Sequence, residues 1–157
     1  MGFRLPPTVS RRIGFEVTAQ APFELDGETA RCRQLDGEIE ISVFKAALVI
    51  DRDGILEEKA RHAIVDEVAG GADVLEPMPV TVGTASGWRI DAEYRRGATR
   101  PALPYIYVFA LAPEDLGVDA GVLVIVRSAS PEWPTADAIV QSLKILSRRT
   151  ATANDRG

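Results

Sequence analysis

The chain has 157 residues, of which 46% are hydrophobic and 26% charged, and its mean hydropathy is +0.00. A chain of this length fits one domain, which buries roughly 70% of its extended-chain surface and needs no metal or disulfide cross-links to fold. Its formal net charge is −5, with 23 acidic and 18 basic side chains interspersed, whereas polyanion binding requires a concentrated basic face. The composition therefore excludes global disorder and argues against a nucleic-acid partner.

Cys32 is the only cysteine, which excludes an intrachain disulfide, a thiolate zinc site and a CxxC redox pair. The first residues contain no apolar run typical of a signal peptide. Nowhere do about eighteen consecutive apolar residues occur, so no membrane span is predicted. We expect a protein of the reducing cytoplasm.

Residues 1–14 are predicted to form an irregular arm, because two consecutive prolines break regular structure. An edge strand is expected from Phe15, interrupted by Pro22. The Asp36-Gly37 pair between two patterned segments predicts a β-hairpin. Alternate residues in its second arm predict one buried face: Ile39, Ile41 and Val43.

The stretch VIDRDGILEEKARH, residues 49–62, resembles a calcium loop at first sight. Gly54 at the sixth position of such a loop would place Val49 first and Ala60 last, so two required carboxylates are absent. The aspartates instead suit the start of a helix, where they accept hydrogen bonds from free N–H groups. The spacing predicts a helix that ends at Gly70-Gly71 and buries one stripe: Leu56, Ala60, Ala63, Ile64 and Val68.

Glu58, His62 and Asp66 lie at i, i+4 and i+8 on the other face of this helix. One helical row cannot surround a metal ion, and the chain has no second histidine. We expect a solvated row of i,i+4 pairs, and no metal or cofactor site.

Residues 72–82 are predicted to form a strand interrupted by Pro77 and Pro79. Residues 87–95 and 105–112 then form a long hairpin. The first strand alternates, with Trp88, Ile90, Ala92 and Tyr94 on one face and Arg89, Asp91, Glu93 and Arg95 on the other. The second strand is apolar on both faces and is therefore predicted to be central in the sheet.

A register that sets Tyr94 against Tyr105 and Ala92 against Tyr107 would gather the aromatic residues on one face. This face is predicted either to be core beneath a helix or to line a ligand pocket. It comprises Trp88, Tyr94, Tyr105, Tyr107 and Phe109. The loop arginines Arg95, Arg96 and Arg100 could hold a phosphate or an acidic partner, or lie in solvent.

Residues 121–129 predict another strand that is apolar on both faces, followed by a closing helix that begins near Pro134. Its buried positions are expected to be Ala136, Ile139, Val140, Leu143 and Leu146. Residues 148–157 read as a frayed tail, so residues 15–147 are predicted to be one domain. The order of elements indicates an α+β fold, a mostly antiparallel β-sheet with helices packed on its faces.

This order resembles the PsbP-like superfamily of α/β/α sandwiches, which includes the DcrB-like bacterial proteins. The resemblance covers about residues 15–147. It rests on element order, on Gly87-Trp88 before the long hairpin, and on Ser142-Leu143 in the closing helix. In place of the aliphatic-Pro and Gly-Trp signature of many relatives the chain has APFELDG. Membership of the PsbP-like superfamily would imply its fold and a non-catalytic binding role. It would assign no functional residue to this chain, because no motif carries one.

Three functions are therefore compared. The first is a non-enzymatic accessory domain that binds a protein partner, with a homodimer as one version. The second is a carrier of a small ligand, held in an aromatic-lined pocket between sheet and helix. The third is an enzyme that uses Asp91 and Glu93 with Arg89, which would require these groups to converge in a closed cleft. The first is our prediction.

Overall fold

The computed structural model describes residues 15–17, 23–27, 29–46, 48, 50–68, 71–97, 101–114 and 120–145. The predicted N-terminal arm and C-terminal tail lie outside these residues, as do Arg100, Leu146 and Gly70. No helix in the described part is long and apolar enough to cross a membrane.

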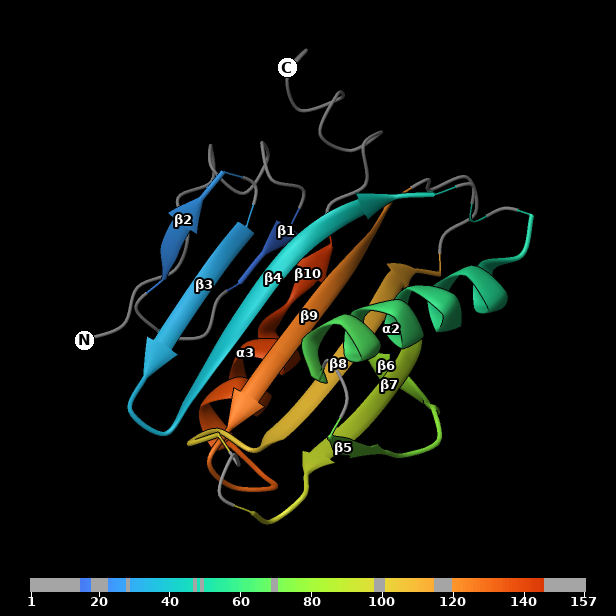
Figure 1. Ribbon diagram of the computed structural model, residues 1–157. Coiled ribbons are helices and arrows are strands. Elements are labelled where there is room, and N and C mark those ends of the chain that lie inside the picture. The colour runs from blue at the N-terminus through green and yellow to red at the C-terminus, as the bar shows by residue number, and fades with distance from the viewer. Residues whose placement is uncertain are drawn as a thin grey trace.

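An eight-stranded antiparallel sheet forms the centre of the fold (Figure 1). Its order is β2 (Glu24–Asp26), β3 (Thr29–Gln34), β4 (Gly37–Lys45), β9 (Ala120–Ser128), β8 (Tyr105–Pro113) and β7 (Ala85–Tyr94). Two short strands, β5 (Ala72–Val74) and β6 (Met78–Val82), both pair with the outer edge of β7. A separate two-stranded sheet joins β1 (Phe15–Glu16) to β10 (Lys144–Ile145).

Helices α2 (Arg52–Val68) and α3 (Pro134–Ser142) lie on opposite faces of the large sheet (Figure 1). The predicted α+β class is confirmed. So is the β3–β4 hairpin, in which Gln34 pairs with Gly37. The predicted interruption before β6 also occurs, because the edge strand is divided into β5 and β6.

Helix α2 begins as the sequence predicts. The carboxylate of Asp51 accepts a hydrogen bond from the backbone N–H of Gly54, at 3.2 Å, which satisfies one of the free donors of the first turn. The row of Glu58, His62 and Asp66 is exposed, and His62 Nε2 lies 3.9 Å from the Glu58 carboxylate. The predicted stripe is the buried one: Leu56, Ala60, Ala63, Ile64 and Val68.

Polar contacts attach both ends of α2 to the sheet. The Arg52 guanidinium donates to the carbonyl oxygens of Ser86, at 3.0 Å, and Ala112, at 2.6 Å. At the other end the Tyr94 hydroxyl donates to a carbonyl of the last turn, that of Glu67, at 3.1 Å. These contacts join the first and last turns of α2 to β7 and β8.

Helix α3 is shorter than the sequence predicts. It starts at Pro134, whose missing N–H costs nothing in a first turn, and its buried residues include Ala136 and Ile139. The helix ends at Ser142, since Leu143 takes an extended conformation with ψ of 130°. The next residues pair with β1 as strand β10, and this pairing replaces a last helical turn.

The predicted register between β7 and β8 is wrong by one residue. Glu93, and not Tyr94, lies opposite Tyr105, and Asp91 lies opposite Tyr107. A slip of one residue moves every side chain of one strand to the other face relative to its partner strand. The single aromatic face is therefore not formed.

The aromatic residues are divided between two cores. The core beneath α2 contains many small residues, among them Ala60, Ala63, Ala92 and Ala110, and half-buried Trp88 and Tyr94 pack against it. The core beneath α3 contains Tyr107, Phe109 and Trp133. Tyr105 is half-buried on the same face as these rings. Strand β8 is buried on both faces, as predicted for a central strand.

Gly87 is a close contact between β7 and β8. A β-carbon built there would lie 1.8 Å from the carbonyl oxygen of Ala110. The atoms that a β-carbon would meet belong to the backbone of β8. A change of side-chain conformation therefore cannot relieve the clash in this closely packed sheet.

We expect Gly87→Ala to lower the free energy of unfolding by about 3 kcal/mol, because the strands must separate to admit the methyl group. Gly97→Ala is the matched control, since no atom lies within 4 Å of its β-carbon position, and it should change stability by less than about 0.5 kcal/mol. Urea unfolding followed by circular dichroism measures both. Equal stability of the two variants would contradict the close approach of the strands.

Candidate functional site

Two cross-strand rows build a pocket on the α3 face of the sheet. One row runs from Asp73 through Glu93 to Tyr105. In the next row Asp91 lies opposite Tyr107, and the N–H of Leu75 donates to the Asp91 carbonyl at 2.8 Å. Directly opposed residues share a face, so these side chains point to the same side.

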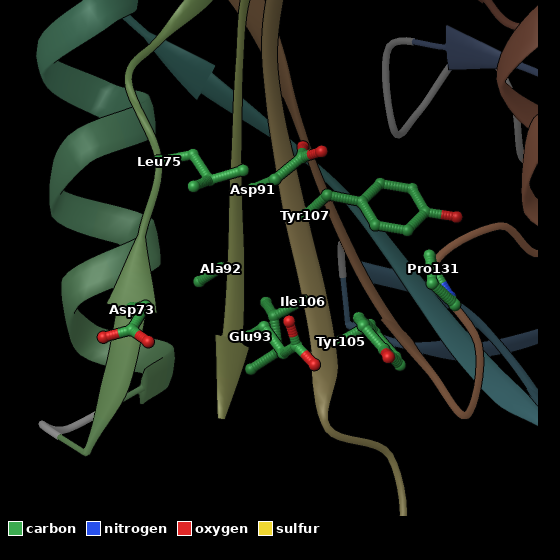
Figure 2. Close-up of a pocket in the computed structure, with 9 residues that line it drawn as sticks. All are labelled: Asp73, Leu75, Asp91, Ala92, Glu93, Tyr105, Ile106, Tyr107 and Pro131. Carbon is green, nitrogen blue, oxygen red and sulfur yellow. The ribbon is translucent and has the colours of Figure 1, made fainter. Parts of the chain in front are cut away.

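The pocket has a volume of about 420 Å³. Figure 2 shows Tyr105 and Tyr107 projecting from β8 towards the side where Pro131, in the segment before α3, lies. Helix α3 contributes none of the lining residues. The pocket is therefore the part of this face that lies between the edge strand and the segment leading into α3.

Two arginines neutralise part of the acidic lining. Arg89 donates to both carboxylate oxygens of Asp91, at 2.7 and 3.3 Å, and Arg95 donates to Asp73 at 2.9 Å. The Arg89 guanidinium also lies 4.4 Å from the centre of the Tyr107 ring, a distance at which a cation is attracted to an aromatic face. A cation is thus already stabilised beside this pocket.

The hydroxyl of Tyr107 is buried and has no hydrogen-bond partner among the residues that the structure describes. The residue is only 2% exposed. Burial, assisted by the negative charge of Asp137 and opposed by Arg89, raises the pKa of Tyr107 to about 12. The backbone N–H of Trp133 is near enough to oppose the rise in pKa, but it is not in hydrogen-bonding geometry. An unpaired buried hydroxyl is costly, and this oxygen is closed to solvent.

An exposed apolar rim borders the pocket along the sheet edge. Leu75 is 61% exposed and Met78 is 47% exposed. Met78 pairs with Arg89, so its side chain lies on the α3 face, as that of Leu75 does. The rim and the pocket therefore form one continuous surface, which we call the pocket face: Asp73, Leu75, Met78, Asp91, Glu93, Tyr105, Tyr107 and Pro131.

The residues predicted from the sequence as ligand or partner contacts are dispersed. Tyr105 and Tyr107 line the pocket. Trp88 and Tyr94 face α2 on the other side of the sheet. Arg95 pairs with Asp73 beside the pocket, and Arg96 is exposed. Arg100 lies outside the described residues.

Asp91 and Glu93, the acidic residues considered for an enzyme, line this pocket, and Arg89 beside it pairs with Asp91. The described residues include no group of three or more His, Cys, Asp or Glu side chains placed to hold a metal ion. Burial raises the pKa of Cys32, which lies in the core beneath α3.

Sequence reasoning missed Asp73, Leu75 and Pro131 as pocket residues. Asp73 and Leu75 enter because β5 joins the edge of β7, and Pro131 enters because the chain returns across this face before α3. The sequence carried one local signal near Met78, which lies between Pro77 and Pro79, because prolines are typical of edge strands.

Tyr107→Phe should leave the free energy of unfolding unchanged or raise it by up to about 1 kcal/mol, since the removed hydroxyl is unpaired. Tyr94→Phe is the matched control and should lose about 1 kcal/mol, because the Tyr94 hydroxyl donates to α2 carbonyls. Chemical denaturation at pH 7 measures both variants. A large loss on Tyr107→Phe would reveal a hydrogen-bond partner for this hydroxyl in solution.

The raised pKa of Tyr107 also predicts alkaline instability. The folded protein holds this proton up to about pH 12, whereas the unfolded chain releases it near pH 10. The folded state therefore binds more protons in this window, so stability is lost as the pH rises from 10 towards 12. Unfolding free energies over this range should fall more steeply for the wild type than for Tyr107→Phe. Parallel curves would show that Tyr107 titrates alike in both states.

Comparison with solved structures shows the same fold in proteins of very different sequence. The cyanobacterial PsbP (CyanoP) from Synechocystis sp. PCC 6803 is 10% identical, with a TM-score of 0.55 over 90% of this chain and 91% of that one. The Saccharomyces cerevisiae Ran-binding protein Mog1p is also 10% identical, with a TM-score of 0.52 over 87% and 93% of the two chains. No family model and no curated protein matches the sequence. This chain has the PsbP-like fold that its order of elements predicts.

Proposed function

We propose that this protein is a non-enzymatic accessory domain that holds a protein partner on the pocket face. The observation that carries the proposal is the exposure of Leu75 and Met78 directly beside a pocket that acidic and aromatic side chains line. Apolar side chains rimmed by polar groups are typical of protein interaction sites. Burying the two side chains against a partner would remove apolar area from water and so favour binding.

The chemistry of the pocket supports binding over catalysis. The Asp91 carboxylate accepts a bidentate pair of hydrogen bonds from Arg89. Burial raises the pKa of Tyr107 to about 12, so its phenol stays protonated at neutral pH. His62 is exposed on α2, on the opposite side of the sheet from the pocket. The described part of this surface therefore has no imidazole to act as a general base.

The fold is compatible with a protein partner. One solved structure with this fold is that of a Ran-binding protein. Fold likeness without sequence likeness carries a function only as an analogy, so the partner of this chain is not inferred from it. A cytoplasmic location also stays a prediction.

The edge strand favours docking through side chains over pairing with a second copy. β5 and β6 are separated by residues 75–77, and Pro79 lies within β6. An interrupted edge with prolines offers no continuous hydrogen-bond ladder to an added strand. A carrier role is also less favoured, because the predicted aromatic lining is divided between the two faces.

Site-directed photocrosslinking tests the proposal. A benzoylphenylalanine introduced at Leu75 or Met78 in cells of the source organism should cross-link to one discrete protein. Val65 on α2 is the matched control position, since it is equally exposed at 61% and lies on the other side of the sheet. Equal cross-linking from Leu75 and Val65, or none from either rim position, would refute this interaction surface.

A further inference from the structure

We propose that the pocket receives one uncharged aromatic side chain, a phenylalanine or tryptophan, from a protein partner whose other apolar residues cover Leu75 and Met78. This inference rests on the proposed function and adds the chemistry of the partner. The ring would lie between the edge of the sheet and Pro131, beside the two exposed rim residues.

The charges at the pocket already have partners, which is the first reason. The Asp91 carboxylate accepts two hydrogen bonds from Arg89, and that of Asp73 accepts one from Arg95. Glu93, the third carboxylate in the lining, also has an interaction partner. A charged side chain that entered the pocket would lose water without meeting a free carboxylate, and this desolvation is costly. The arrangement therefore favours an uncharged group.

The size of the pocket is the second reason. Its volume is about 420 Å³, whereas an apolar protein cavity of about 150 Å³ already binds a benzene molecule. A phenyl or indole ring therefore fits, and one aliphatic side chain would leave much of the space unfilled. Unfilled space forfeits dispersion contacts, so a large ring gains more from this pocket than a small side chain does.

The aromatic rings of the α3 face are the third reason. Tyr105 is half-buried and lines the pocket, and Figure 2 shows its side chain on the side where Pro131 lies. Aromatic rings attract one another in edge-to-face or offset arrangements, in addition to the effect of the buried area. The rings of Tyr107 and Phe109 already meet in this way, at 80° and with their centres 5.9 Å apart. A further ring beside Tyr105 would extend the same kind of packing.

The exposed rim is the reason to expect the ring on a protein and not on a free small molecule. Leu75 is 61% exposed and Met78 is 47% exposed. Met78 does not line the pocket, so a small molecule confined there would leave this side chain in water. Protein interfaces commonly place an aromatic anchor in a pocket and surround it with contacts that exclude water. A protein partner can insert the ring and cover the rim together.

The test titrates the ¹⁵N-labelled full chain with blocked peptides and follows the backbone amides by NMR. Each peptide has a central residue flanked on both sides by leucine and then serine, and the central residue is phenylalanine, alanine or arginine. The phenylalanine peptide should shift the amides of Leu75, Asp91 and Tyr105. It should bind about tenfold more tightly than the alanine peptide, because the pocket removes its ring from water. The arginine peptide should bind no more tightly than the alanine peptide.

Salt concentration distinguishes this mode of binding from a charged one. Affinity for the phenylalanine peptide should change by less than about twofold between about 50 mM and about 500 mM sodium chloride, because salt screens charge pairs and not apolar contacts. N-acetylphenylalanine amide tests the ring without its apolar neighbours and should bind more weakly than the peptide.

A pair of variants locates the binding surface. Leu75→Ser should weaken the phenylalanine peptide about tenfold, because an apolar contact of the rim is lost. Val65→Ser is the matched control, since Val65 is equally exposed at 61% and lies on α2, and it should leave affinity unchanged. Both side chains are exposed, so both variants should stay folded.

Any of four results would overturn the inference. Equal affinity for the phenylalanine and alanine peptides, or no binding of either, would show that the pocket does not take a ring. Tightest binding of the arginine peptide, or a tenfold loss of affinity in salt, would show that charge carries recognition. Equal loss on Leu75→Ser and Val65→Ser would place binding elsewhere. Binding of N-acetylphenylalanine amide as tight as that of the peptide would assign the pocket to a free aromatic molecule.

The inference and the proposed function can fail separately. Cross-linking of one discrete protein from Leu75, alongside any of these four results, would leave the proposed function standing and reject only the aromatic anchor.

Discussion

The pairing of β7 with β8 is the constraint on which the rest of the structure depends. Gly87 lets β7 approach the Ala110 carbonyl so closely that no β-carbon fits between them, and the ladder runs from this contact to Glu93 opposite Tyr105. This register places Ile106, Val108 and Ala110 beneath α2 and the rings of Tyr107 and Phe109 towards α3. Each helix packs on the surface that this one alignment presents to it.

The two helices are held by different physical means. Helix α2 lies on a surface of small residues, and polar contacts secure both of its ends: Arg52 binds carbonyls of β7 and β8, and at the other end Glu67 accepts from Arg127. Helix α3 is shorter and depends on apolar burial, with Trp133 packed against Gly37 so that a β-carbon there would lie 2.7 Å from the indole. After α3 the chain continues in an extended conformation from Leu143. No residue of α3 lines the pocket.

The pocket is a consequence of the same alignment. Because Asp91 and Glu93 lie opposite the two tyrosines, polar and aromatic side chains alternate across this face where an apolar core would otherwise continue. Arg89 is held both by the Asp91 carboxylate and by the Tyr107 ring, which keeps a half-buried charge paired. The Tyr107 hydroxyl has no hydrogen-bond partner among the described residues, which is an unfavourable feature of this face that calls for an explanation.

The sequence by itself determined the α+β class, the hairpin at Asp36-Gly37, the start and buried stripe of α2, and the interrupted edge strand. Each of these depends on local chemistry: Asp51 bonds within its own turn, and Leu56 to Val68 repeat at the helical period. The register of β7 against β8 was decided only by the tertiary structure, because β8 is apolar on both faces and its alternation favours neither alignment. The pocket residues Asp73, Leu75 and Pro131 come together through the same long-range packing, which no local pattern encodes.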